Sequence, residues 1–345
     1  MRILGIETSC DETAAAVVSE DKKILSNVLY SQIREHKAFS GVVPEVAARA
    51  HLDCLDPIIS EAMSQADLSF TDLDGIAVTC GPGLIGGVMV GVMAAKTLAA
   101  YHDLPFLAIN HLAAHALTPR LTDSIEFPYL VLLVSGGHTQ LLIANSPVSF
   151  ELLGSTLDDA VGEAFDKTAR LLELPYPGGP AIEKMAQTGN PLAYSLPRPL
   201  LTKKNPDLKY TFSLSGLKTA MRKQIEEASP LTPDKKADLA ASFQKCLSDI
   251  LASRLENALV LCAEENIHLQ GVVLAGGVAA NQEIRTSLHD VTKLFSTILV
   301  APPVKLCTDN AAMVAWAGIE KMKRGLTDAL DFMPRPRWPL QELKS

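Results

Sequence analysis

The 345-residue sequence lacks several features that would place a protein in a familiar class. Its six cysteines form no CxxC pair, which favours neither a zinc ribbon nor a disulfide scaffold. The formal net charge is −8, so any contact with nucleic acid would need a local basic patch. No GxxxxGK[ST] motif is present, which excludes a P-loop nucleotide site, and there is no low-complexity segment.

The sequence also lacks a recognisable secretory leader and a clear membrane span. Residues 1–6 indicate a short strand and no signal peptide. The apolar stretch 84–100 contains Lys96 and many small residues, which favours a buried helix over a membrane span. The apolar fraction of 48% and the charged fraction of 20% are typical of a soluble globular protein with room for two domains. We therefore expect a reduced, cytoplasmic enzyme with no membrane contact.

The order of predicted elements repeats along the chain. Short apolar runs separated by polar turns occur in two sets of three, at 2–7, 13–19, 24–30, 129–134, 140–144 and 150–154. A predicted helix follows each set, over 44–64 and over 157–174. Two structurally similar lobes are the simplest explanation of this pattern. Further strands are predicted at 75–79, 105–109, 271–274 and 297–301, and further helices at 216–227 and 233–266.

A GxGxxG motif that starts at Gly81 follows the predicted strand 75–79, so a dinucleotide fold must be considered. Two observations count against it. Three strands and a helix precede the motif, and the next strand ends in Asn110 and His111, where an acidic residue is expected. We therefore interpret these glycines as allowing a tight turn and close helix packing.

His111 and His115 lie four residues apart in a segment that indicates a helix. Four residues is just over one turn, so both imidazoles project from one face and can bind the same metal ion. Asp309 lies in a polar tripeptide at the start of a helix predicted to run to Lys323, and it would complete a set suited to Zn²⁺ or Fe²⁺. The alternatives are histidines that cap or pack a helix end, and Thr308 or Asp309 as an ordinary N-cap.

Three glycine-rich turns suggest a nucleotide site, because glycine lets backbone N–H groups approach an anion or a purine closely. Asp166 and Asn281 are candidate partners for a ribose or a base, and His138 is either a phosphate donor or a surface histidine. The turns are 135–139, 177–180 and 275–278.

Two charged clusters remain. Glu7, Asp11 and Glu12 lie around one tight turn, where they need a positive neighbour, a proton-transfer role or full solvation. The segment 198–223 carries seven basic residues against one acid, Asp207. It would either contact RNA phosphates or form a solvated face. The basic residues are Arg198, Lys203, Lys204, Lys209, Lys218, Arg222 and Lys223.

Several motifs occur together in an order typical of one family. They are IETSCDET at 6–13, the His111–His115 pair, VSGGHT at 134–139, FDK at 165–167, YPGGP at 176–180, FSLSGLKT at 212–219, AGGV at 275–278 with Asn281, and CTDN at 307–310. Over residues 1–335 the chain resembles the tRNA threonylcarbamoyladenosine transferase family, of the TsaD type, formerly described as O-sialoglycoprotein endopeptidases.

The resemblance implies an α/β protein with the actin-like ATPase and sugar-kinase fold. Two duplicated, ribonuclease H-like lobes with a cleft between them are expected: a first lobe of 1–125 completed by 305–345, and a second lobe of 126–304. The implied reaction moves a threonylcarbamoyl group from threonylcarbamoyl-adenylate to the N6 amine of the adenosine 3′ of the anticodon and releases AMP. The implied substrates are tRNAs that read codons starting with A.

The resemblance also implies roles for individual residues. His111, His115 and Asp309 would bind one divalent metal ion per subunit, Fe²⁺ in the first place and Zn²⁺ as the alternative. The adenylate would be bound by Val134, Ser135, Gly136, Gly137, His138, Asp166, Gly179 and Asn281. Glu183 stands where some relatives have Asp. Asp11 or Glu12 would orient or deprotonate the attacking amine.

The expected partners are tRNA and, in bacteria, a shorter paralogous protein of the TsaB type and a small ATPase of the TsaE type.

Three other functions compete with this interpretation. A metallopeptidase is disfavoured because the HxxxH pair lacks the Glu of HExxH. A small-molecule kinase of the same fold would need a catalytic Asp in the cleft and no protein-bound metal pair. A structural metalloprotein would not need the paired glycine turns.

Overall fold

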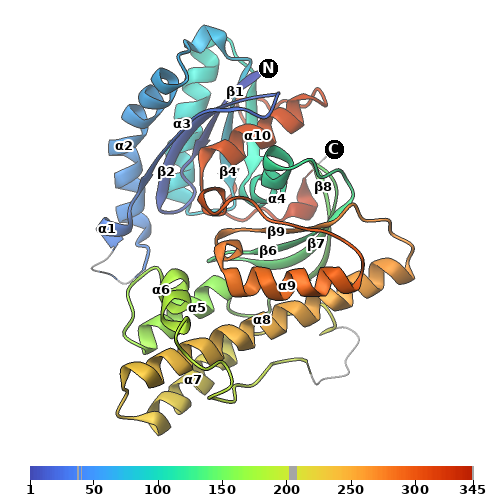
Figure 1. Ribbon diagram of the computed structural model, residues 1–345. Helices are drawn as coiled ribbons and strands as arrows, with labels where there is room; N and C mark the ends of the chain where they lie inside the picture. The colour runs from blue at the N-terminus through green and yellow to red at the C-terminus, as the bar shows by residue number, and fades with distance from the viewer. Residues whose placement is uncertain (37–38, 40, 202–207, 344–345) are drawn as a thin grey trace. The chain divides into compact units, whose positions relative to one another are not determined.

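The computed structural model describes residues 1–36, 39, 41–201 and 208–343 (Figure 1). The chain divides into two compact units. Unit 1 comprises Met1–Ser124, Asn145–Phe150 and Thr308–Ser345, and unit 2 comprises Ile125–Ala144 and Glu151–Cys307. Each unit contains one five-stranded sheet with helices, so the predicted α/β class is confirmed.

The sheet of unit 1 has the strand order β3-β2-β1-β4-β5. Strand β2 is antiparallel to β1, whereas β1, β4 and β5 are mutually parallel neighbours. The carboxyl ends of these three parallel strands therefore meet at one edge of the sheet, where α/β proteins place their functional groups. The strands are β1 (Arg2–Glu7), β2 (Glu12–Ser19), β3 (Ile24–Ser31), β4 (Gly75–Gly81) and β5 (Phe106–Asn110).

Helices cover this sheet on both faces, which explains why β1 and β2 are almost continuously apolar. Gly5 in β1 allows the closest approach, because a Cβ there would lie 2.4 Å from the carbonyl oxygen of Ala311 in α10. This contact fixes the start of α10 over the sheet. The helices of unit 1 are α1 (Ile33–His36), α2 (Pro44–Gln65), α3 (Ile85–His102), α4 (His111–Thr122) and α10 (Ala311–Met322).

Helix α3 has the length and hydropathy of a membrane span. Val88, Val92, Ala95 and Ala99 nevertheless pack into the hydrophobic core of unit 1. The prediction of a buried helix holds for this face only, because the opposite face exposes large apolar side chains. Those side chains are Ile85, Met89, Met93 and Tyr101.

The segment after α10 crosses the end of the sheet as a strap. The Arg335 amide donates to the Cys80 carbonyl at 2.7 Å, and the Asn110 side chain donates to the Trp338 carbonyl at 2.8 Å. Gly81 has φ +137°, and a Cβ there would lie 1.8 Å from the Arg335 carbonyl oxygen. A Cβ at Gly83 would lie 2.6 Å from a backbone oxygen. The GxGxxG glycines therefore serve close packing, as interpreted from the sequence.

The sheet of unit 2 has the order β10-β9-β6-β7-β8. Numbered from its first strand, this is the same order as in unit 1, with β7 antiparallel to β6 and β9 and β10 parallel to their neighbours. The duplication predicted from the sequence is therefore confirmed. The strands are β6 (Tyr129–Val134), β7 (Thr139–Ser146), β8 (Ser149–Ser155), β9 (Val272–Ala275) and β10 (Leu299–Val300).

The helices of unit 2 form one core with its sheet. They are α5 (Val161–Leu171), α6 (Gly178–Ala186), α7 (Ser215–Ala228), α8 (Pro233–Glu264) and α9 (Gln282–Leu294). Helix α5 begins four residues later than predicted, and α6 begins inside a stretch expected to be only a glycine loop. Within the basic segment 198–223, residues 202–207 lie outside the described part of the chain.

Asp158, three residues before the start of α5, caps another helix. Its carboxylate accepts from the backbone amides of Leu214, at 2.7 Å, and Ser215, at 3.1 Å. It also accepts from the hydroxyls of Ser213 and Ser215, each at 2.8 Å. Burial raises the pKa of Asp158, but these hydrogen bonds lower it by more, so its pKa lies below the usual value. The start of α7 therefore depends on a charged side chain 56 residues earlier.

Candidate metal centre and nucleotide site

Strand β5 and helix α4 position the two histidines of the predicted metal site. Asn110 ends β5 and caps α4, because its side-chain oxygen accepts from the amides of Leu112 at 2.9 Å and Ala113 at 3.2 Å. The helix therefore begins at His111, and His115 follows one turn later on the same face. Both imidazoles are buried or nearly so, at 9% and 2% exposure.

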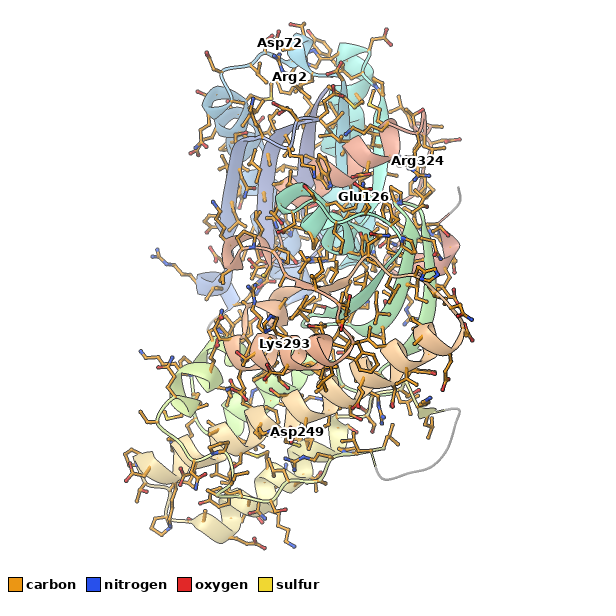
Figure 2. The ribbon with its side chains drawn as sticks, turned by 45° about the vertical axis from the view of Figure 1, so that its right-hand side comes forward. Arg2, Asp72, Glu126, Asp249, Lys293 and Arg324 are labelled. Atoms are coloured by element: carbon orange, nitrogen blue, oxygen red, sulfur yellow. The ribbon has the colours of Figure 1, made fainter. Side chains whose placement is uncertain are left out.

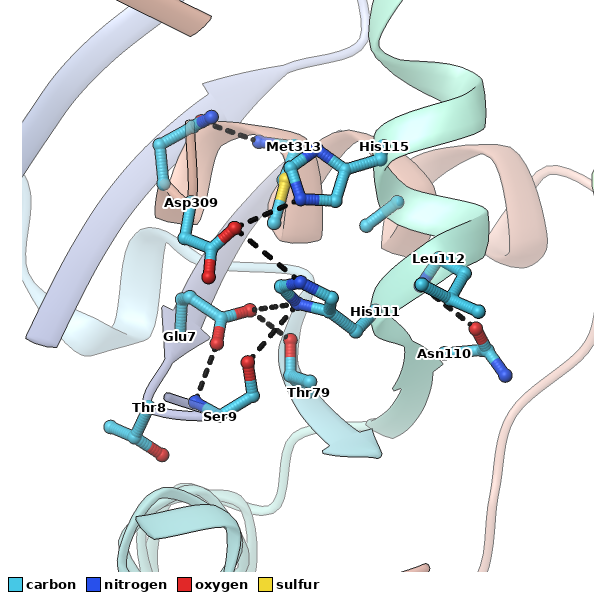
Figure 3. Close-up of polar contacts among 12 residues, drawn as sticks. Glu7, Thr8, Ser9, Thr79, Asn110, His111, Leu112, His115, Asp309 and Met313 are labelled. Atoms are coloured by element: carbon cyan, nitrogen blue, oxygen red, sulfur yellow. Dashed lines mark hydrogen bonds and ion pairs between the residues drawn. The ribbon is translucent and has the colours of Figure 1, made fainter. Parts of the chain in front are cut away.

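Asp309 reaches this histidine pair from a segment almost two hundred residues away (Figure 3). Its Oδ1 lies 2.9 Å from His115 Nε2 and 3.4 Å from His111 Nε2. The predicted N-cap at Thr308 or Asp309 is wrong: Asn310 caps α10 by accepting from the Met313 amide at 3.0 Å. Because Asn310 serves the helix, the Asp309 carboxylate is available to the histidines.

The three ligand atoms have the spacing that one metal ion requires. They lie within 4.8 Å of one another. Ligands at about 2.1 Å from a tetrahedral ion are about 3.4 Å apart, close to the two distances to Asp309. Two imidazole nitrogens and one carboxylate oxygen suit Zn²⁺ or Fe²⁺. Among the residues that the structure describes, no other group of this kind is close enough to hold a metal ion.

Glu7 lies against the other ring nitrogen of His111, a contact that sequence reasoning missed. Its Oε2 is 3.1 Å from His111 Nδ1, and its Oε1 accepts from the Ser9 amide at 2.6 Å. The Thr79 hydroxyl donates to Oε2 as well. Glu7 is fully buried at the end of β1. The three acids of this turn indicated that a positively charged neighbour was needed. The local sequence could not identify His111 as that neighbour, because it lies 104 residues away.

The charges of this cluster reinforce one another. Burial lowers the pKa of His111, but Asp309 and Glu7 raise it by more, so the pKa lies well above its ordinary value. Burial raises the pKa of Asp309, but His111 and His115 lower it by more, and it falls well below its usual range. For Glu7, the effect of burial is likewise outweighed by His111, and its pKa is lowered. The two carboxylates therefore favour positive charge at His111.

The acidic turn of Asp11 and Glu12 belongs to the same unit. Its backbone is held by buried groups: His51 Nε2 donates to the Cys10 carbonyl at 3.1 Å, and the Gln32 amide donates to the Asp11 carbonyl at 2.9 Å. Burial raises the pKa of Glu12 well above its usual value, and Asp309 and Asp11 raise it further. Glu12 therefore has a higher proton affinity than an ordinary carboxylate, which suits a group that accepts a proton near neutral pH.

The predicted nucleotide residues gather in unit 2. Val134 ends β6, and the turn Ser135–His138 is closed by the Ser135 amide on the His138 carbonyl at 2.8 Å. Strands β6 and β9 are parallel, so this turn and the one at Gly276 leave the same edge of the sheet. At Gly136 and Gly137 a Cβ would meet no atom within 4 Å, so protein packing does not require glycine there.

The other predicted contacts surround this edge. Asp166 accepts from the Gly178 amide at 2.7 Å and so fixes the start of α6. At the next residue, Gly179, a Cβ would also meet no atom within 4 Å. Asn281 is buried; it caps α9 and donates to Gln244 Oε1 at 2.9 Å. Glu183 accepts from the Gln282 amide at 2.7 Å, a helix-cap contact that the sequence did not predict. Ligand contacts of these residues stay predictions.

The chain matches one protein family over most of its length. The family model described as TsaD, tRNA N6-adenosine threonylcarbamoyltransferase, matches residues 23–316. A protein of that name from Brucella anthropi is 53% identical over 99% of this chain and 96% of the relative. One from Rhodopseudomonas palustris is 53% identical over 98% of this chain and 93% of the relative.

Solved structures show the same fold at low identity. A full-length HypF structure superposes with a TM-score of 0.60 at 12% identity, over 94% of this chain and 46% of HypF. An ROK hexokinase from Thermus thermophilus gives a TM-score of 0.51 at 14% identity, over 94% and 99% of the two chains. These proteins support the predicted actin-like ATPase and sugar-kinase fold. By the extent and identity of its full-length matches, the chain belongs to the tRNA N6-adenosine threonylcarbamoyltransferase family.

Proposed function

We propose that this protein transfers a threonylcarbamoyl group from threonylcarbamoyl-adenylate to the N6 amine of the adenosine 3′ of the anticodon, in tRNAs that read codons starting with A. The amine nitrogen attacks the carbamoyl carbonyl carbon, the bond from that carbon to the phosphate oxygen breaks, and AMP leaves. One proton must leave the attacking amine. The observation that carries this proposal is the full-length match to the family, whose motifs coincide with the buried cluster in unit 1 and the open glycine turns in unit 2.

In this proposal, His111, His115 and Asp309 hold one divalent metal ion, Fe²⁺ or Zn²⁺. Their donor atoms and spacing fit such an ion, and the surrounding carboxylates favour positive charge. When bound, the ion supplies Lewis-acid charge stabilisation for oxygens that become more negative during acyl transfer. Metal analysis of anaerobically purified protein tests this assignment, with His115→Ala as the control that loses one ligand.

The glycine turns of unit 2 are proposed to bind the adenylate. Open space in front of Gly136, Gly137 and Gly179 lets a phosphate or a purine approach the backbone closely. Amide N–H groups directed at the acyl-phosphate would stabilise the negative charge that develops on the leaving group. His138 and Asp166, in the same unit, are proposed to contact the nucleotide as well.

Glu12 is proposed as the group that takes the proton from the attacking amine, with Asp11 as its neighbour. Its raised pKa supports this role, because a base of ordinary carboxylate strength would hold the proton poorly near neutral pH. Replacing Glu12 by Gln should reduce single-turnover transfer sharply while adenylate binding persists. Unchanged single-turnover rates would remove Glu12 from the mechanism.

The basic residues of α7 are proposed to contact tRNA phosphates. Lys218, Arg222 and Lys223 are exposed on this helix. Arg198, on the same segment of sequence, is instead paired with Asp249 at 2.7 Å, so it contributes less free charge. Asp249 is labelled on α8 in Figure 2. Lys203, Lys204 and Asp207 of the predicted basic segment lie outside the described residues.

The expected protein partners are a shorter paralogue and a small ATPase, and the cytoplasm is the proposed location. The exposed apolar row of Ile85, Met89 and Met93 on α3 supports a protein partner, since a row of this kind is usually covered. Glutamate at Met89 and Met93 should weaken association with the paralogue without changing the free energy of unfolding of the isolated chain.

The experiment that tests the function combines the protein with its partner proteins, threonine, bicarbonate, ATP and unmodified tRNA. The modified nucleoside is then sought by mass spectrometry of the digested tRNA. We expect product with the unaltered chain and little or none with Asp309→Asn. Absence of product together with cleavage of added peptides would favour the metallopeptidase alternative and overturn the proposal.

A further inference from the structure

Glu7 is a buried carboxylate that lies against the ring nitrogen of His111 that does not face Asp309 (Figure 3). It is 0% exposed, although it carries a charge. The donors that reach it are the Ser9 amide, the Thr79 hydroxyl and His111 Nδ1. Removing a carboxylate from water is costly unless such donors compensate it, so this arrangement must be specified by the fold.

The contact with His111 determines which ring nitrogen carries the proton. An ionised carboxylate can only accept, so His111 must donate to Glu7 through Nδ1–H. The Ser9 hydroxyl, 3.2 Å from the same nitrogen, can accept or donate and does not oppose this arrangement. The lone pair of a neutral His111 is then on Nε2, the nitrogen that lies 3.4 Å from Asp309 Oδ1.

We propose that Glu7 is a positioning residue for the metal centre: it fixes the orientation and the tautomer of His111, so that Nε2 is ready to bind a divalent ion. The inference rests on the proposed metal site and assigns no substrate contact to Glu7. Carboxylates that hold a metal-binding histidine in this way raise the basicity of the ring and add to metal affinity.

Two substitutions separate the effect of the Glu7 charge from the effect of its side-chain length. Glu7→Gln keeps the length but replaces two accepting carboxylate oxygens with one accepting oxygen and one donating NH₂ group. If its amide nitrogen faces His111, it donates to Nδ1 and moves the ring proton to Nε2, where it competes with the metal. If it faces the Ser9 amide, two donors meet. Glu7→Asp keeps the charge but is shorter by about 1.5 Å, so it loses the contact.

Thr8→Val is the matched control. Thr8 is the next residue, is equally buried, and donates from its hydroxyl to the Gly87 carbonyl at 2.9 Å. Valine has nearly the same shape but removes that buried hydrogen bond, and no contact joins Thr8 to His111 among the hydrogen bonds that the structure describes. A general loss of packing around β1 should therefore affect Thr8→Val as much as Glu7→Gln.

The measurement is the affinity of the full-length, metal-stripped protein for Co²⁺ and Zn²⁺, determined at pH 8 without oxygen by competition with a chromophoric chelator. We expect Kd to rise about 10- to 100-fold for Glu7→Gln and Glu7→Asp. It should stay within about threefold for Thr8→Val, and His115→Ala should bind far more weakly than any of them. Nitrogen NMR of the zinc-loaded chain should show His111 protonated at Nδ1.

The outcomes distinguish this inference from the proposal beneath it. If the unaltered chain binds no ion at these residues, the metal centre fails and the role of Glu7 fails with it. If the unaltered chain binds one equivalent but Glu7→Gln binds it equally well, only the positioning role is overturned. An equal loss in Thr8→Val also overturns it. Thermal unfolding of the metal-free variants identifies any that do not fold, in which case Glu7→Asp decides.

Discussion

Two glycines on the same edge of the unit 2 sheet should respond differently to replacement by alanine: one substitution should weaken ligand binding, and the other should lower the free energy of unfolding. At Gly137 a Cβ would meet no atom within 4 Å, and its backbone is not in the left-handed region. At Gly276, φ is +93° and a Cβ would lie 2.4 Å from the Val134 carbonyl oxygen. We propose that the first glycine is needed by the ligand, and the geometry shows that the second is needed by the fold.

The magnitudes follow from these surroundings. An alanine at Gly276 costs about 1–3 kcal/mol for its backbone conformation, because φ +93° with ψ 169° is a region that only glycine adopts readily. It costs about 1–3 kcal/mol more for the shift of neighbouring backbone, so the free energy of unfolding should fall by about 2–6 kcal/mol. An alanine at Gly137 should change stability by less than about 1 kcal/mol. Its methyl group would occupy the space proposed for the nucleotide, and a tenfold loss of affinity corresponds to about 1.4 kcal/mol.

The assay pairs chemical unfolding with calorimetric titration of AMP, the proposed product. Gly137→Ala should unfold like the unaltered chain and bind AMP at least about tenfold more weakly. Gly216→Ala is the matched control, because that glycine is equally open but lies in the first turn of α7. If Gly137→Ala binds AMP normally, the open glycine turn is not the nucleotide site. If it unfolds as easily as Gly276→Ala, the structural argument is wrong.

Three further predictions concern helix starts and charge. Asp158→Asn should expose the first amides of α7 to hydrogen exchange at pH 7. Because the pKa of Asp158 is lowered, its carboxylate stabilises the folded protein above about pH 4, and this contribution is lost as the pH falls through the native pKa. Hydrogen exchange in the variant and in the unaltered chain should therefore become equal in acid. Asn110→Ala removes the cap of α4 and the bond to the strap, and unfolding by denaturant should show a loss of about 1–2 kcal/mol. Replacing Lys218 and Arg222 by Glu should weaken tRNA binding for all sequences alike, and the salt dependence of the affinity should become shallower; an unchanged salt dependence would place the tRNA elsewhere.

Local pattern predicted the duplicated strand order because that order depends on apolar runs and turns close together in sequence. The six runs read as strands near residues 2–30 and 129–154 are β1 to β3 and β6 to β8. Within each set, consecutive strands pair with each other, so little long-range information was needed.

Helix starts were less predictable because several residues compete to cap them. Thr308, Asp309 and Asn310 are all good N-caps, and their sequence does not rank them. The choice is made by His111 and His115, which hold Asp309 and leave the cap to Asn310. In the same way, Asp158 caps α7 instead of α5, a pairing across 56 residues that no local pattern contains.

The sequence predicted that His111, His115 and Asp309 lie together, which the structure shows, but it did not predict the Glu7 contact beside them. The spacing of the two histidines suggested a shared ligand face, and Asp309 was the candidate third ligand from its polar tripeptide, a role that the family resemblance also implied. Glu7 was seen only as one acid of a turn, because its partner is 104 residues away. The registers of β1 against β4 and of β4 against β5, which bring the two together, are set by tertiary packing. Contacts that depend on strand register cannot be predicted from the sequence, even when each residue involved has been identified as a candidate.

Unit 1 is built from separate parts of the chain, and this has a consequence for its synthesis. Residues 1–124 leave the ribosome first, but α10, which packs on the sheet that they form, belongs to the segment that starts at Thr308. Apart from one short excursion, unit 2 lies entirely between them. Unit 2 is therefore completed before unit 1, although domains usually mature from the N-terminus onward. A nascent chain that ends near residue 307 contains every residue of unit 2, whereas the sheet of unit 1 still lacks α10, and Glu7 and both histidines still lack Asp309.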